Sequence, residues 1–177
     1  MTHKTAARPR GGPRSSATRR GHKPDALEIL VLEHRRFEAL LAQGEALTER
    51  ARKGRRQLLE SLMSELAVHE RMEEQILYPA LLSYSHTRET LTEGFHEHDS
   101  ALAIVDELKA IPTDDVEWGA RFKALKESLQ DHMDHEEQHL FPVARGVFSH
   151  EELRSLAERM LALRPQRRSP GRRRRQG

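Results

Sequence analysis

The stretch "HMDHEEQHLFP" at positions 132–142 places histidine and glutamate where an amphipathic helix should carry its apolar residues. Just upstream, Phe122, Leu125 and Leu129 follow the three- and four-residue steps of a helix face that packs into a core. The same steps continue to His132, Glu136, His139 and Val143. Because a helix buries this face, the sequence predicts a helix that buries imidazole and carboxylate groups.

This stretch has a second copy earlier in the chain. "LAVHERMEEQILYP" (66–79) aligns without gaps to "LQDHMDHEEQHLFP" (129–142), and Glu33-His34 corresponds to Glu97-His98. The copies lie 63 and 64 residues apart, which indicates two related helical hairpins. Packed face to face, the hairpins would gather four histidines and two glutamates at one pseudo-symmetric centre: His34, His69, Glu73, His98, His132 and Glu136.

Helical periodicity covers almost all of residues 24–163, and no stretch there alternates with a period of two. The pairs expected to start helices are Asp25 with Glu28, Asp114 with Glu117, and Ser149 with Glu152. Lys53-Gly54 breaks the pattern, the second helix is expected to reach about Ser83, and the third should end near Pro112. The predicted fold is all-α, an antiparallel up-down-up-down four-helix bundle with a short C-terminal fifth helix and disordered basic tails.

Each of the four long helices has at least one histidine in the seam that it should bury, and the fourth has two, His132 and His139. The seams of the first three helices are Leu27, Leu30, His34, Phe37 and Leu41; Leu59, Leu62, Leu66, His69, Glu73, Ile76 and Ala80; and Leu91, Phe95, His98, Leu102 and Val105. Pro79 and Pro142 lack the N–H that continues a helix, so we expect them to end or kink the second and fourth helices. Tyr78 and Phe141 should close that end of the site. Four histidines fall off the seams and should be solvated or support the site: His86, His96, His135 and His150.

The charge is distributed very unevenly along the 177 residues. Residues 1–23 and 164–177 hold 14 basic residues and no acid, so the net charge of +2 leaves −12 for residues 24–163. We therefore expect four segments: a basic disordered tail (1–23), the bundle (24–147), a short helix (148–163) and an arginine-rich disordered tail (164–177).

Composition excludes several classes of protein. The chain has no cysteine, which excludes disulfides, thiolate metal sites and cysteine nucleophiles. No apolar run approaches the length of a membrane helix, so no membrane partner is expected. The N-terminal composition resembles an organellar transit peptide, but the default expectation is the cytoplasm.

The buried polar residues call for a chemical explanation. An unpaired buried carboxylate costs several kcal/mol, and two in one core would cost more. Protons shared among the imidazoles could relieve part of this cost, and a metal would relieve it more completely. Imidazole and carboxylate without sulfur suit iron first, with manganese and zinc behind. Two six-coordinate ions have about twelve positions, of which four imidazoles and two bridging carboxylates fill about eight. The rest would accept an oxo or hydroxo bridge and water or a diatomic ligand.

Four segments resemble the metal-bearing helices of hemerythrin-like, HHE cation-binding domains. They are "EHRRFEALL" (33–41), "HERMEEQILYPAL" (69–81), "EHDSALAIVDEL" (97–108) and "HMDHEEQHLFPV" (132–143). The resemblance covers residues 25–147 and implies a non-haem di-iron centre in a four-helix bundle. It implies as ligands the same six residues that the seams select.

Two departures distinguish the chain from the oxygen-carrying hemerythrins. Those carriers add a second histidine four residues after the one on the third helix, where this chain has Leu102. They also place an aspartate five residues after the histidine of the fourth helix, whereas this chain has Glu136 four residues after it. The chain therefore resembles the broader bacterial HHE group, and simple oxygen transport is not expected. A further ligand could come from Glu38, Glu70 or His139.

The leading functional hypothesis is a di-iron protein that binds or senses O₂, NO or peroxide, or that buffers iron. Turnover of peroxide or NO would make it an enzyme, and the sequence leaves this open, as it does the oligomeric state. Another class of function is non-specific nucleic-acid binding through "RPRGGPRSSATRRGHK" (8–23) and "GRRRRQG" (171–177). Solubilising tails are the simpler interpretation of these segments. A ferritin-like carboxylate bundle is less favoured, because Glu136-x-x-His139 fits its motif but Glu73-x-x-Ile76 does not.

Overall fold

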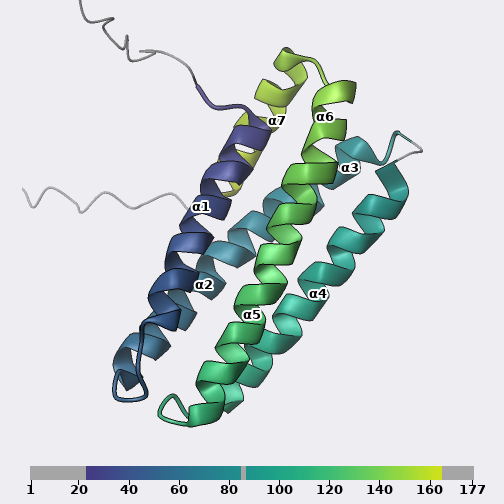
Figure 1. Ribbon diagram of the computed structural model, residues 1–177. Coiled ribbons are helices and arrows are strands. Elements are labelled where there is room, and N and C mark those ends of the chain that lie inside the picture. Colours follow the sequence, from purple (N-terminus) through teal and green to yellow (C-terminus); the bar gives the residue numbers. More distant parts are fainter. Residues whose placement is uncertain (1–22, 85–86, 165–177) are drawn as a thin grey trace, which may run out of the picture.

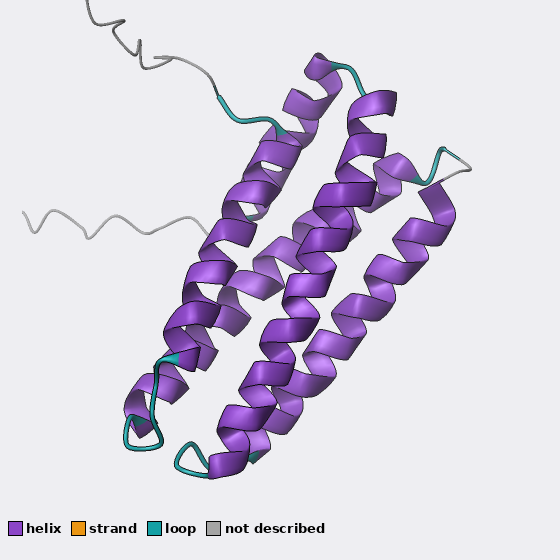
Figure 2. Cartoon of the chain, in the orientation of Figure 1, coloured by secondary structure: helices purple, strands orange, loops and turns teal. Residues whose placement is uncertain are grey.

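The computed structural model describes residues 23–84 and 87–164, and every regular element in these ranges is a helix (Figure 2). The elements are α1 (Ala26–Glu45), α2 (Arg52–Met72), η1 (Glu73–Leu77), α3 (Tyr78–Leu81), α4 (Arg88–Ala110), α5 (Val116–His135), η3 (Glu136–Leu140), α6 (Phe141–Val147) and α7 (His150–Leu163). The predictions made for residues 1–22 and 165–177 lie outside the described residues. None of the described helices is both long and apolar enough to cross a membrane.

The predicted up-down-up-down bundle is confirmed. Helices α1, α2, α4 and α5 run side by side along the molecule, and each is antiparallel to the next along the chain (Figure 1). The η1 and α3 segments prolong α2, while η3 and α6 prolong α5. The fifth helix, α7, folds back to pack against α1 and α2.

Most helix boundaries follow the predicted signals. Capping boxes start α1 and α7, as predicted, through the pairs Asp25 with Glu28 and Ser149 with Glu152. For α5 the prediction was off by one residue, because Asp115 rather than Asp114 accepts the Glu117 N–H. Lys53-Gly54 does not break a helix but lies in the first turn of α2. Glycine costs most in the middle of a helix, and Gly54 lies near the start of this one.

Two apolar clusters lie on either side of a layer of buried histidine and glutamate side chains, the polar layer of the bundle. One cluster includes Leu30, Met72 and Leu140, and the other includes Phe37 and Leu66. On α1, His34 lies between Leu30 and Phe37 in the sequence, so the polar layer separates the two clusters. The predicted seams on α1 and the main part of α2 are confirmed as buried.

The helices do not end at the two prolines. The backbone remains helical to Leu81 and Val147, past Pro79 and Pro142. Just before each proline, one π-helical segment replaces the α-helix: the N–H of Tyr78 donates to the Glu73 carbonyl, five residues back. The corresponding bond joins Phe141 and Glu136. A wider turn accommodates a residue that cannot donate to the carbonyl four residues before it.

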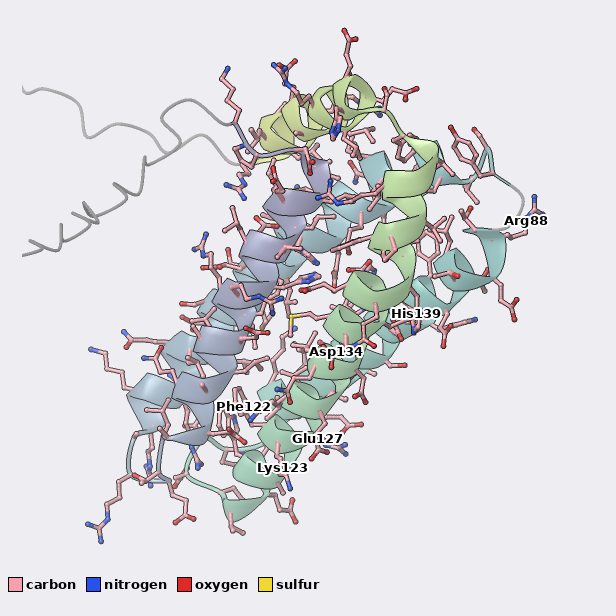
Figure 3. All side chains as sticks on the ribbon, turned by 45° about the horizontal axis from the view of Figure 1, so that its top comes forward. Arg88, Phe122, Lys123, Glu127, Asp134 and His139 are labelled. Atoms are coloured by element: carbon pink, nitrogen blue, oxygen red, sulfur yellow. The ribbon has the colours of Figure 1, made fainter. Side chains whose placement is uncertain are left out.

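The π turns change which residues face the interior. Each inserts an additional residue, so the buried face after Glu73 continues at Leu77 and Leu81 instead of Ala80, which is only half-buried. After Glu136 it continues at Leu140 and Ala144, whereas the predicted Val143 is half-buried. The predicted seam position His139 is exposed (Figure 3). This exposure also removes His139 from a ferritin-like Glu-x-x-His pair.

The predicted seam of α4 was wrong at two positions. Phe95 and Leu102 are 40% and 46% exposed, and the interior is lined by Gly94 and Ala101 in their place. A Cβ atom at Gly94 would lie 2.7 Å from the Tyr78 hydroxyl, so a larger residue there would displace that hydroxyl. Both seams pass through His98, which is buried as predicted.

Candidate metal centre

The structure brings the six predicted ligands together in the polar layer of the bundle. Each is at most 4% exposed, and α1, α2, α4 and α5 each contribute one histidine: His34, His69, His98 and His132. The two glutamates stand at the first residue of each π segment: Glu73 and Glu136. Their role as metal ligands stays a prediction, but they can form two overlapping groups around cations.

The first group consists of His34, His69, Glu73 and Glu136. The Nε2 atom of His69 lies 3.2 Å from His34 Nε2 and 3.1 Å from Glu73 Oε1. The Nε2 atom of His34 lies 3.4 Å from Glu136 Oε2. Four donors therefore converge on one point: one each from α1 and α2, and one from the π segment of each hairpin.

The second group consists of Glu73, His98 and His132. The Nε2 atom of His98 lies 3.2 Å from Glu73 Oε2, so the two oxygens of Glu73 face different groups. His132 Nε2 lies 3.6 Å from Glu136 Oε2. Glu73 therefore belongs to both groups and Glu136 to one, and the bridging role predicted for the two glutamates stays a prediction.

Unsatisfied polar atoms concentrate at this centre. Within the described residues, six buried side-chain N or O atoms lack a hydrogen bond, and five of them belong to the two groups: both Glu73 oxygens, Glu136 Oε2, His98 Nε2 and His132 Nε2. Several lie within 3.6 Å of another polar atom but not in hydrogen-bond geometry. Because buried polar groups normally find partners, these atoms fit a cation as their common partner.

Four further glutamates, which the sequence did not point to, contact the histidine nitrogens that face away from the centre. Each Nδ1 atom has a carboxylate partner: His34 with Glu137 at 2.8 Å, His69 with Glu33 at 3.2 Å, His98 with Glu74 at 3.0 Å, and His132 with Glu97 at 2.9 Å. A carboxylate that accepts the Nδ1–H fixes the ring orientation and leaves Nε2 for a metal.

These four carboxylates obey the same internal repeat as the ligands. Glu33 and Glu97 each precede a seam histidine, and Glu74 and Glu137 each follow a seam glutamate. The repeated "EH" and "EE" pairs were visible in the sequence, but it did not show which histidine each of these glutamates contacts on another helix. The pseudo-symmetry of the two hairpins therefore includes the carboxylates that contact the histidines as well as the six predicted ligands.

Two arginines anchor supporting carboxylates on the α1 side. Arg35 pairs with Glu137, and Arg164 donates to Glu33 at 2.6 Å. Burial alone raises the pKa of Glu33, but its hydrogen bond with His69 and the charges of His69 and Arg164 outweigh burial and lower it. Glu33 therefore stays ionised and available to the His69 Nδ1–H.

The metal-free centre holds protons tightly. Burial lowers the pKa of His69, but the charge of Glu73 and the hydrogen bond to Glu33 outweigh it and raise that pKa to about 10. The pKa of His98 rises to about 9, because its contacts with Glu73 likewise outweigh burial. For Glu73 itself, burial raises the pKa, while the neighbouring His69 and His98 hold it well below its ordinary value. A cation would have to displace these imidazole protons.

A cavity of about 10 Å³, close to the smallest that holds one water, adjoins the centre. His98, His132 and His69 line it together with Glu70 and Ala101. Burial, more than the neighbouring charges, raises the pKa of Glu70.

Of the three candidates for a further ligand, only Glu70 lies beside the centre, since it lines this cavity. Glu38 is exposed and pairs with Arg35, and His139 is exposed.

The off-seam histidines in the described residues lie away from the two groups. His96 and His150 are exposed. His135 is half-buried and contacts Glu97, the partner of His132, at 3.3 Å, and the supporting role predicted for it stays a prediction. His86 lies outside the described residues.

Comparisons with known proteins agree with this centre. The family model of the hemerythrin HHE cation-binding domain matches residues 25–144. The crystal structure of a hemerythrin HHE cation-binding domain-containing protein from Mycobacterium kansasii is similar, with a TM-score of 0.70 and 26% sequence identity over 79% of this chain and 85% of that chain. No curated protein matches the chain significantly. Because the family match spans more than half of the sequence and includes all six predicted ligands, the chain belongs to the hemerythrin HHE cation-binding domain family.

Proposed function

We propose that this protein holds two iron ions at the buried centre and uses them to bind or sense O₂, NO or peroxide, or to buffer iron. The observation that carries the proposal is the set of five buried ligand atoms without hydrogen bonds, shared between two groups that meet at Glu73. Imidazole and carboxylate donors suit iron, with manganese and zinc as less favoured alternatives.

Iron, when bound, would supply redox chemistry and open coordination positions for small ligands. The protein's own residues would control access to it. The apolar clusters on either side limit the entry of water, and the cavity beside His98 and His132 has room for about one water-sized molecule. Glu33, Glu74, Glu97 and Glu137 would keep all four imidazoles oriented toward the metal.

Reversible oxygen transport fits this centre less well than oxidation or sensing. The α4 position that faces the interior one turn beyond His98 is Ala101, because Leu102 points to solvent. Neither residue can supply the additional imidazole of the oxygen carriers. With fewer neutral imidazoles, the two carboxylates make up a larger share of the donors, and anionic oxygen ligands favour the ferric state over the ferrous state.

The test is to load the protein with iron, reduce it without air and then admit oxygen. We expect about two irons per chain by elemental analysis, and rapid, irreversible oxidation that fails in Glu73→Gln and Glu136→Gln. His150→Ala, a change at an exposed histidine, should behave like the wild type. Protein purified with iron and without chelators that contains no metal would refute the proposal.

The same preparation separates the finer possibilities. Oxygen that is taken up and then released under vacuum would make the protein a carrier. Consumption of added peroxide or NO over many turnovers would make it an enzyme. If neither occurs, sensing and iron buffering remain.

A further inference from the structure

The two hairpins differ in one aromatic residue beside the centre. Tyr78 and Phe141 occupy corresponding places in the repeat and are both buried. The Tyr78 ring stacks on His98 with ring centroids 6.0 Å apart, and the Phe141 ring stacks on His34 at 5.7 Å. The two rings therefore pack in equivalent ways, but only Tyr78 carries a hydroxyl group.

The Tyr78 hydroxyl donates a hydrogen bond to Glu136 Oε1 at 2.9 Å. This leaves only Oε2 of Glu136 facing the histidines, at 3.4 Å from His34 Nε2 and 3.6 Å from His132 Nε2. Glu73, in the corresponding place, has no hydrogen bond to either oxygen, and both oxygens face a histidine. The two glutamates are thus alike in sequence but unequal in the number of oxygens that they offer.

The space for this hydroxyl exists on one hairpin only. It lies against Gly94 of α4, where a Cβ atom would approach it to 2.7 Å. The corresponding residue of the first hairpin is Leu30, which is fully buried. Tyr78 with Gly94 and Phe141 with Leu30 therefore occupy equivalent places, but only the first pair has room for a hydroxyl group.

We propose that the Tyr78 hydroxyl makes the two cation positions unequal by withholding one Glu136 oxygen from them. The first position has four protein donors: His34, His69, Glu73 and Glu136. The second has three: Glu73, His98 and His132. A cation binds first at the four-donor position, and the second position keeps more of its coordination sphere for exogenous ligands. This inference rests on the proposed function, since it requires two bound cations, and Tyr78 acts in it as a positioning residue.

The test is a titration of the metal-free full-length protein with Co²⁺, in which calorimetry and visible absorption measure the binding. We expect two binding steps whose dissociation constants differ by about tenfold or more, the effect typical of changing the surroundings of a metal ligand. His98→Ala should remove the weaker step and keep the tighter one, whereas His34→Ala should weaken the tighter step.

Tyr78→Phe removes the hydroxyl but keeps the ring, and it frees Glu136 Oε1 to face the second position. We expect the ratio of the two constants to fall by about tenfold. Gly94→Ala should shift the ratio in the same direction, because the new Cβ atom displaces the hydroxyl. Tyr84→Phe is the matched control, since Tyr84 contacts the Val147 carbonyl outside the centre, and it should leave the ratio unchanged.

The possible results separate this inference from the proposed function. A wild-type protein that binds no Co²⁺ would overturn both. Two Co²⁺ ions of equal affinity, or a ratio that neither Tyr78→Phe nor Gly94→Ala changes, would overturn the inference and leave a two-cation centre in place.

Discussion

Raising the pH should destabilise the metal-free protein through the centre itself. The pKa values of His69 and His98 in the folded protein are about 10 and 9, above their ordinary value of 6.5. Folding therefore binds protons that the unfolded chain releases. This stabilisation is complete below about pH 6.5 and is lost as the pH rises through 9 to 10.

The loss of stability depends on how many additional protons the folded protein binds near Glu73. Both raised pKa values depend on this one carboxylate, so we count one additional proton in the folded state. One proton corresponds to about 1.4 kcal/mol per pH unit, or about 3 kcal/mol between pH 7 and pH 9. For a chain of this size, the melting temperature should fall by roughly 6 to 10 °C.

Circular dichroism of chelator-treated protein at pH 7 and pH 9 measures this change directly. In Glu73→Gln the charge that raises both pKa values is gone, so the decrease in melting temperature should largely disappear. Glu60→Gln, at an exposed position of α2, should keep it. An unchanged melting temperature in the wild type, or an equal decrease in Glu73→Gln, would show that the centre does not hold these protons.

Three further predictions test the ligands, their supports and the core separately. His98→Ala should lower the iron content far more than His96→Ala, because His98 is buried in the centre and His96 is exposed; elemental analysis that finds the reverse would mean that α4 is placed wrongly. Glu97→Gln should weaken Co²⁺ binding by about 10- to 100-fold in a calorimetric titration, the usual effect of losing the partner of a metal-bound histidine, and an unchanged affinity would contradict that role. Gly44→Ala should lower stability by about 1–3 kcal/mol in urea, since the added methyl overlaps the Phe122 ring, while two metal ions still bind; a loss of metal with normal stability would contradict this assignment.

The sequence was sufficient to predict the bundle and the six candidate ligands. A helix repeats its side chains with a short, fixed period, so a histidine at the place of a leucine is visible without any knowledge of the fold. The repeat of residues 66–79 in residues 129–142 added the pairing of two hairpins. Both signals are local or depend on one simple symmetry, which explains why they were reliable.

The register beyond the ligands was not predictable in this way. A change of one residue turns a side chain by about 100° around a helix axis, so one π turn is enough to change the buried face. This is why Ala80, Val143 and His139 were placed wrongly after Glu73 and Glu136. The change follows from backbone hydrogen bonds that span five residues. Pro79 and Pro142 indicate where the helical hydrogen bonds are disturbed, but a proline alone does not specify a π turn.

Contacts between helices decided the rest. The sequence by itself determined that four histidines and two glutamates share a buried layer, because burial follows helical periodicity. Only the tertiary structure paired Glu74 of one hairpin with His98 of the other, and placed the Tyr78 hydroxyl between Gly94 and Glu136. Such contacts join residues from different helices, and their geometry depends on how closely the helices pack, which is a property of the folded interior and not of any one segment.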